Sequence, residues 1–137
     1  MYLLDTSALI DLIKKLPRTV AHLGEMPPAA LFASVISQGE LMTSVVRVKR
    51  LDPDQYREEL EKLTRLWEDF DILPVTSTTA SAYATIQADL ASRGKAKLKI
   101  NDGWIAATAT EHGLTLVTSD GHLKGLTGLV QVEDWRE

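Results

Sequence analysis

Short apolar runs separated by longer amphipathic segments make up most of the chain. Residues 2–4 (Tyr-Leu-Leu) show no polar alternation, which is typical of a strand buried on both faces at the centre of a parallel sheet. Pro74 cannot donate to a sheet ladder, so the strand that contains it belongs at an edge or ends there. Comparable runs predict further strands at residues 30–33, 72–75, 114–118 and 129–132.

Between these runs, apolar residues recur at helical spacing, so predicted strands alternate with predicted helices. Capping residues mark the helix ends: Ser34 or Ser37 before one helix, Asp52 with Pro53 before the next, and Gly113 after another. Helices are predicted through residues 9–16, 17–23, 35–46, 53–67, 80–92 and 104–112, with a short one at 121–124.

This alternation predicts an α/β sandwich around a mostly parallel sheet. In such sheets, ligands bind beyond the carboxyl ends of the strands. Asp5 follows the first predicted strand, Asp120 follows the strand at 114–118, and Asp102 lies near a helix start. We therefore expect these three carboxylates at one edge of the sheet.

Length and composition narrow the class of protein. With 137 residues, 45% of them hydrophobic, we expect one domain over residues 1–137 with its own apolar core. The chain shows no signal-peptide pattern, no membrane-spanning run and no cysteine. A soluble, cytoplasmic protein without a membrane partner is therefore expected.

The formal net charge of −4 argues against binding nucleic acid through a diffuse positive surface. A polyanionic substrate would require a local basic patch or metal ions. A solvated surface explains such basic residues about as well as phosphate binding does. The candidates for phosphate contacts form two clusters, Arg47, Lys49 and Arg50, and Lys95, Lys97 and Lys99.

Each acidic candidate also has a purely structural explanation. Asp5 can cap a helix, Asp102 can favour a helix N-terminus through the helix dipole, and Asp120 can begin an Asx-turn. Glu40 can close a capping box with Ser37. Taken singly, each is better explained as a cap or a turn.

When the four carboxylates are considered together, a shared functional site explains them better than separate caps and turns do. Two unit charges about 4 Å apart repel by about 4 kcal/mol at an effective dielectric near 20, so stability alone gives no reason to cluster them. A divalent cation removes this repulsion, and carboxylate oxygens favour Mg²⁺ or Mn²⁺ over zinc. Such ions commonly serve phosphate chemistry.

Five stretches carry a resemblance to a known family. In order and spacing they resemble PIN-domain ribonucleases, and more narrowly the VapC toxins of bacterial and archaeal toxin–antitoxin pairs. The resemblance spans essentially the whole chain. The stretches are residues 3–10 (LLDTSALI), 34–41 (SVISQGEL), 100–107 (INDGWIAA), 112–120 (HGLTLVTSD) and 132–135 (VEDW).

The resemblance implies a PIN-like three-layer α/β/α sandwich with a five-stranded sheet in the order 3-2-1-4-5. It also implies a metal site, RNA cleavage to 5′-phosphate and 3′-hydroxyl products, a homodimer, and a VapB-like antitoxin that blocks the cleft. Two glycines depart from the pattern. Gly103 replaces a bulkier residue, so a looser helix turn is expected after Asp102, and Gly121 leaves Asp120 poorly constrained.

The resulting hypothesis is a metal-dependent endoribonuclease. Asp5 and Asp102 are expected to hold the principal Mg²⁺ or Mn²⁺, Asp120 to support it or a second ion, and Glu40 to orient the attacking water or a ligand. Caps and turns explain the neighbouring hydroxyls about as well as site roles do. The hydroxyls expected to hydrogen-bond the carboxylates are those of Thr6, Thr118 and Ser119.

Other functions fit the sequence less well. It contains no nucleophile elbow, Walker loop or dinucleotide fingerprint, and its three histidines lack the spacing of a ligand set. A phosphatase or a phospho-accepting receiver domain should show paired acids after the first strand, where only Asp5 stands. A non-catalytic PIN-like binding module stays open, although four intact carboxylates count against it.

Overall fold

The fold is built on one five-stranded sheet. The computed structural model describes all of residues 1–137. The strands are β1 (Tyr2–Leu4), β2 (Leu31–Ser34), β3 (Asp71–Leu73), β4 (Thr115–Val117) and β5 (Val132–Glu133). Every pair is parallel and the spatial order is β3-β2-β1-β4-β5. The predicted fold class and strand order are confirmed.

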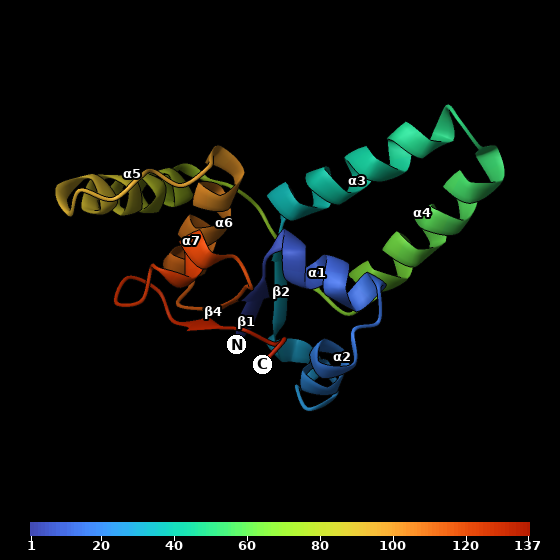
Figure 1. Cartoon of the computed structure of the whole chain (residues 1–137), viewed down its shortest axis with the longest axis horizontal. Coiled ribbons are helices and arrows are strands. Elements are labelled where there is room, and N and C mark those ends of the chain that lie inside the picture. The colour runs from blue at the N-terminus through green and yellow to red at the C-terminus, as the bar shows by residue number, and fades with distance from the viewer.

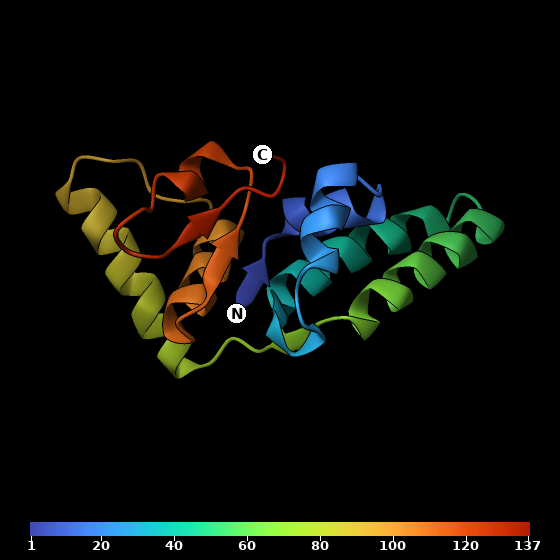
Figure 2. The ribbon, with the colours of Figure 1, turned by 90° about the horizontal axis from the view of Figure 1, so that it is seen from below.

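Helices cover both faces of this sheet. They are α1 (Thr6–Ile13), α2 (Pro17–Gly24), α3 (Val35–Lys49), α4 (Pro53–Glu68), α5 (Ser77–Ser92), α6 (Ile100–Glu111) and α7 (Gly121–Lys124), with a 3-10 turn at Pro28–Ala30. Figures 1 and 2 show α5, α6 and α7 on one side of the sheet and α1 to α4 on the other. This arrangement is the expected three-layer sandwich.

The central strand β1 explains why the core divides in two. Successive side chains of a strand point to opposite faces. Leu3 accordingly packs into a cluster with buried residues of α5, α6 and α7, whereas Leu4 packs into a second cluster with residues of α1, α3 and α4. Neither leucine is exposed to solvent, as the unbroken apolar run predicts.

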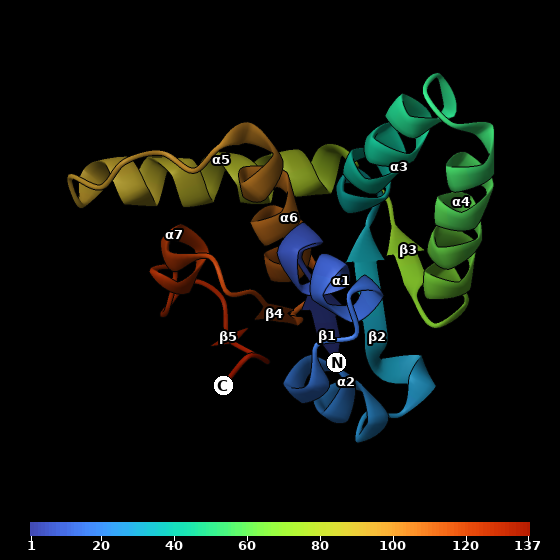
Figure 3. The same ribbon diagram turned by 45° about the vertical axis from the view of Figure 1, so that its right-hand side comes forward.

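Two helical extensions flank the sheet. The helices α3 and α4 pack side by side and project to one side, while α5 projects to the other (Figure 3). The strand β3 ends at Leu73, so Pro74 follows an edge strand as predicted. Between the two serine candidates, Ser34 caps α3 by accepting the Ile36 N–H at 3.1 Å. No helix combines the length and apolarity that crossing a bilayer requires.

Several predicted boundaries differ from those of the structure, and two of these differences have a clear cause. Helix α6 begins at Ile100, not Trp104, because the N–H of Gly103 already bonds the carbonyl of Lys99 at 2.8 Å. The last strand starts at Val132. The N–H groups of Leu129 and Val130 bond back to Leu126 instead, so the apolar residues before Val132 form a turn.

Candidate active site

Asp5 is a buried carboxylate at the carboxyl end of β1. It is the N-cap of α1, where Oδ1 accepts the N–H of Ala8 at 2.8 Å, and it is 3% exposed. Its other oxygen accepts the hydroxyl of Thr118. Burial raises the pKa of Asp5 to about 6, and the charges of Asp102 and Asp120 push it in the same direction. The fold thus keeps this carboxylate where its charged form is disfavoured.

Asp120 is held at the carboxyl end of the neighbouring strand β4. Its Oδ1 caps α7 by accepting the N–H groups of His122 at 2.8 Å and Leu123 at 3.2 Å. Its own N–H donates to the Thr118 hydroxyl at 3.0 Å. The expectation that Gly121 leaves Asp120 poorly constrained was wrong, because these three hydrogen bonds define the turn without help from a side chain at position 121.

Asp102 lies in the first turn of α6, where the charges of both Asp120 and Glu40 act on its carboxylate. Partial burial raises its pKa, and so do the charges of Asp120 and Glu40, while Lys99 and His122 act in the opposite direction. Its carboxylate makes no hydrogen bond within the protein, in contrast to Asp5 and Asp120. Both oxygens of Asp102 are therefore available to a ligand.

Glu40 approaches the same region from the second turn of α3. Its Oε1 accepts the hydroxyl of Thr6 at 2.9 Å, and the Oγ of Ser37 lies 2.9 Å from that hydroxyl. Ser37 is fully buried. The pattern Ser-x-x-Glu, which the sequence suggested as a capping box, instead places both side chains on the helix face that meets α1. Ser119, by contrast, makes no side-chain hydrogen bond.

Several carboxylate oxygens of the site make no hydrogen bond and can accept a ligand directly. Those without a hydrogen bond in the protein are both oxygens of Asp102, Oδ2 of Asp120 and Oε2 of Glu40. Mutual repulsion among carboxylates is relieved by a cation, and carboxylate oxygens suit Mg²⁺ or Mn²⁺. In this structure no three acidic or histidine side chains stand close enough to hold one ion together, so an ion here would use one or two carboxylates and keep water as its other ligands. The donor chemistry fits such an ion.

The start of α6 is held in place by α5. A Cβ on Gly103 would lie 2.6 Å from Cε2 of Tyr83, and Tyr83 stacks on Trp104 with centroids 4.3 Å apart. The amide of Gln87 bonds both the N–H and the carbonyl of Leu98, at 3.1 and 3.3 Å. The expected looser turn at Gly103 was wrong, because the glycine permits close helix contact. No local pattern indicated Tyr83 or Gln87.

The two basic clusters differ in their relation to the carboxylates. Lys99 lies close enough to lower the pKa of Asp102, as does His122, which the sequence gave no reason to select. Lys49 follows Glu40 along α3 by about 14 Å at 1.5 Å per residue, and its ammonium lies 5.4 Å from the ring centroid of Tyr56. The structure brings Lys99 to the site and leaves the cluster 47–50 on the projecting arm.

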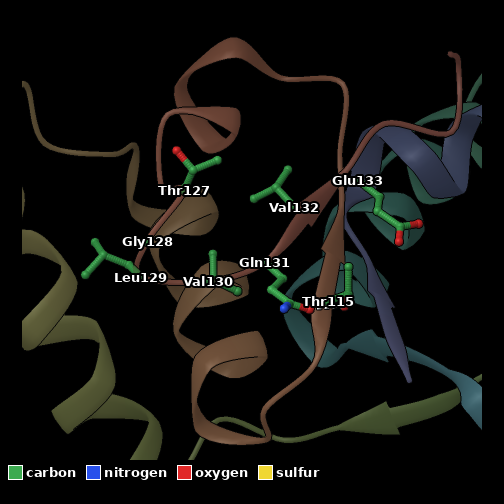
Figure 4. A pocket seen from close by; sticks show the side chains of 8 residues that line it. All are labelled: Thr115, Thr127, Gly128, Leu129, Val130, Gln131, Val132 and Glu133. Carbon is green, nitrogen blue, oxygen red and sulfur yellow. Dashed lines mark hydrogen bonds between the residues drawn. The ribbon is translucent and has the colours of Figure 1, made fainter.

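A hollow of about 510 Å³ lies beside β5, lined by residues 127–133 and Thr115 (Figure 4). Glu133 is its only ionisable side chain, and its Oε2 accepts the indole N–H of Trp135 at 3.0 Å. None of the four carboxylates lines this hollow. It is therefore separate from the acidic site.

Comparisons with known proteins place the chain in a family. The family model described as PIN domain matches residues 2–129. Ribonuclease VapC5 of Mycobacterium tuberculosis is 31% identical over 107 residues, which cover 77% of this chain and 76% of that protein.

Two solved structures are similar over nearly their whole length. FitAcB from Neisseria gonorrhoeae has a TM-score of 0.87 at 30% identity and covers 100% of this chain and 99% of its own. VapBC-5 from Mycobacterium tuberculosis, described as a member of the VapBC family of toxin-antitoxin systems, has a TM-score of 0.68 at 27% identity and covers 96% and 94%. With its sheet order, its acidic edge and a family match over residues 2–129, this chain belongs to the PIN-domain family.

Proposed function

We propose that this protein is a metal-dependent endoribonuclease that acts as the toxin of a toxin–antitoxin pair, with residues 1–137 as a single PIN domain. One observation carries the proposal: four segments distant in the sequence bring their carboxylates to the carboxyl edge of the sheet, where burial raises the pKa values of Asp5 and Asp102 and the charges of the neighbouring carboxylates raise them further. A relative named as a ribonuclease and a similar toxin–antitoxin structure support it.

Each of the four carboxylates has its own role in this proposal. Asp102 and Asp5 hold the principal ion, Asp120 supports it or a second ion, and Glu40 orients the attacking water. When bound, Mg²⁺ or Mn²⁺ supplies a more acidic water and offsets charge on the phosphate and the departing 3′-oxygen. Thr118 and Thr6 fix the carboxylate rotamers through the hydrogen bonds described above. The products are a 5′-phosphate and a 3′-hydroxyl.

Partners follow from the same assignment. The substrate is RNA, contacted by the basic residues near the site, with Lys99 the nearest to Asp102. A VapB-like antitoxin blocks the site, and the toxin forms a homodimer in the cytoplasm. The alternatives are another acidic-pocket phosphohydrolase and a non-catalytic binding module.

Cleavage by purified protein separates these functions. The protein is freed of any antitoxin and incubated with RNA in Mg²⁺, in Mn²⁺ and in chelator. The wild type should cleave only with metal, Asp102→Asn should lose cleavage, and Asp71→Asn, at an exposed position on the edge strand, should keep it. Cleavage in chelator, or full activity of Asp102→Asn, would falsify the mechanism. Hydrolysis of a phosphomonoester without RNA cleavage would favour the phosphatase reading.

A further inference from the structure

The segment 133–137, which we call the closing segment, touches both helices that begin at a site carboxylate. Asp5 caps α1 and Asp120 caps α7. The closing segment starts at the same edge of the sheet, where the carbonyl of Glu133 accepts the N–H of Thr118 at 2.9 Å. It then makes one charged contact with α1 and another with α7.

The contact with α1 is a two-pronged ion pair. Nε and one terminal nitrogen of Arg136 donate to the two oxygens of Asp11 at 2.7 and 2.8 Å. The Asp11 side chain is 5% exposed and has no other hydrogen-bond donor, so its buried charge depends on this guanidinium. The hydrogen bond to Asp11 raises the pKa of Arg136, and the charge of Asp5 adds to that shift. The guanidinium thus stands within electrostatic reach of the site.

The contact with α7 involves Lys124, the last residue of that helix. Its ammonium pairs with the carboxylate of Asp134 and lies 3.5 Å from Glu137. The other oxygen of Asp134 accepts the N–H of Arg136 at 2.9 Å. The two contacts are therefore coupled through neighbouring residues of the closing segment.

A buried aromatic residue anchors the segment between these contacts. Trp135 is 2% exposed, lies parallel to the ring of His22 with centroids 5.5 Å apart, and also contacts Tyr2. An anchored segment transmits displacement between its two ends. Helix α1 places Asp11 only about 9 Å beyond Asp5, and α7 is a single turn, so neither helix is long enough to absorb such a displacement by bending.

We propose that Arg136 is a positioning residue that, through Asp11, holds α1 and its cap Asp5 in register with α7 and its cap Asp120. The closing segment acts as a clamp on the distance between these two carboxylates. The catalytic consequence rests on the proposed function, whereas the mechanical coupling does not.

Amide hydrogen exchange in the full chain without metal tests the coupling, because Ala8 N–H reports on Asp5 and His122 N–H on Asp120. Arg136→Lys keeps the positive charge but loses the planar guanidinium that donates two hydrogen bonds to Asp11. It should speed exchange at Ala8 about tenfold and affect His122 less. Lys124→Met should give the reverse order. Leu63→Ala, which weakens the core under α4, is the control: at an equal fall in Tm it should show no such selectivity.

Mn²⁺ binding, followed by the spin-resonance signal of the free ion, tests the consequence for the site. Arg136→Lys should weaken Mn²⁺ binding about five- to tenfold and lower kcat while KM for RNA stays unchanged, and Leu63→Ala should bind Mn²⁺ as the wild type does. Wild-type exchange at Ala8 in folded Arg136→Lys overturns the clamp. If the wild type neither binds Mn²⁺ nor cleaves RNA, the proposed function is wrong. The hydrogen-exchange rates at Ala8 and His122 then still test whether the closing segment acts as a clamp.

Discussion

The hydroxyl of Thr118 donates to the carboxylate of Asp5, a residue 113 positions away in the sequence. The same hydroxyl accepts the N–H of Asp120 at 3.0 Å. Thr118 is 1% exposed, so water cannot take over either bond. One side chain therefore links the carboxylate of Asp5 to the backbone of Asp120, a second residue of the proposed metal site.

Removing that hydroxyl should destabilise the protein. Thr118→Val leaves one oxygen of the buried Asp5 carboxylate and the N–H of Asp120 without their partner, and a buried unsatisfied group costs about 1–3 kcal/mol. We expect the free energy of unfolding, measured by urea denaturation at pH 7 in chelator, to fall by at least that amount. Thr118→Ser keeps the hydroxyl and is the control. Equal losses in the two variants would mean that packing of the methyl group, not the hydrogen bond, carries the effect.

The raised pKa of Asp5 predicts a pH-dependent stability. Its value of about 6 exceeds the ordinary 3.8, so the folded state binds the proton more tightly than the unfolded state. Asp5 therefore stabilises the fold at low pH, and this contribution is lost as pH rises from about 4 to about 6. A shift of this size corresponds to about 3 kcal/mol as an upper value.

Comparison with Asp5→Asn isolates this contribution from those of other carboxylates. The variant keeps a cap acceptor but cannot ionise. In chelator, its free energy of unfolding relative to the wild type should rise between pH 4 and pH 6 and level off above. A constant difference across that range would show that burial does not disfavour the charge of Asp5.

Asp102 should affect stability in opposite ways with and without metal. Its charge is repelled by Asp120 and Glu40, and it makes no hydrogen bond that the substitution would break. In chelator, Asp102→Asn should therefore melt a few degrees above the wild type. Mn²⁺ at a hundred times its Kd should stabilise the wild type by about 2.7 kcal/mol and the variant far less. Asp71→Asn should match the wild type in both conditions. A variant that melts lower in chelator would assign Asp102 a structural role.

Local sequence rules predicted a mostly parallel α/β sandwich and the positions of Asp5 and Asp120 after their strands because both depend on short-range patterns, whereas the strand order was implied by the family resemblance. An unbroken apolar run indicates a central strand, and the polar residue that ends it, such as Asp5 or Asp120, must lie at the carboxyl edge of a parallel sheet. The choice between Ser34 and Ser37 was not predictable in this way. Both carry the same capping signal, and only the point at which β2 ends decides between them.

What the sequence did not predict depends on contacts between distant segments. The two-pronged ion pair between Arg136 and Asp11 joins residues 125 positions apart. The sequence around each residue gives no sign that the two are paired. Gly103 was misinterpreted because helix propensity concerns a helix in isolation. In the folded protein, Gly103 instead allows α5 and α6 to pack closely together.

Salt dependence of RNA binding should distinguish the two basic clusters. Lys99 lies near Asp102, whereas Lys49 sits over Tyr56 on the projecting arm. In chelator, Lys99→Gln should lower the slope of log binding constant against log salt by about 0.7 to 1, the value for one phosphate contact. Lys49→Gln should leave the slope unchanged. The opposite ranking would move the RNA path onto the arm formed by α3 and α4.

Gly103 offers the sharpest test of packing beside the site. Alanine favours a helix over glycine by about 1 kcal/mol, yet its Cβ here would lie 2.6 Å from the ring of Tyr83. That ring cannot withdraw freely because it stacks on Trp104. Overpacking costs about 1–3 kcal/mol, so Gly103→Ala should lower the free energy of unfolding measured in urea.

Gly39 is the matched control for this substitution. It also lies inside a helix, but an added Cβ meets no atom within 4 Å. Gly39→Ala should therefore stabilise the protein by up to about 1 kcal/mol. Tyr83→Leu combined with Gly103→Ala should cost less than the sum of the two single changes, because the smaller side chain relieves the contact. If Gly103→Ala stabilised the protein as Gly39→Ala does, α5 and α6 could not be packed as closely as the structure places them. The inference that α5 holds the first turn of α6, and with it Asp102, in place would then be wrong.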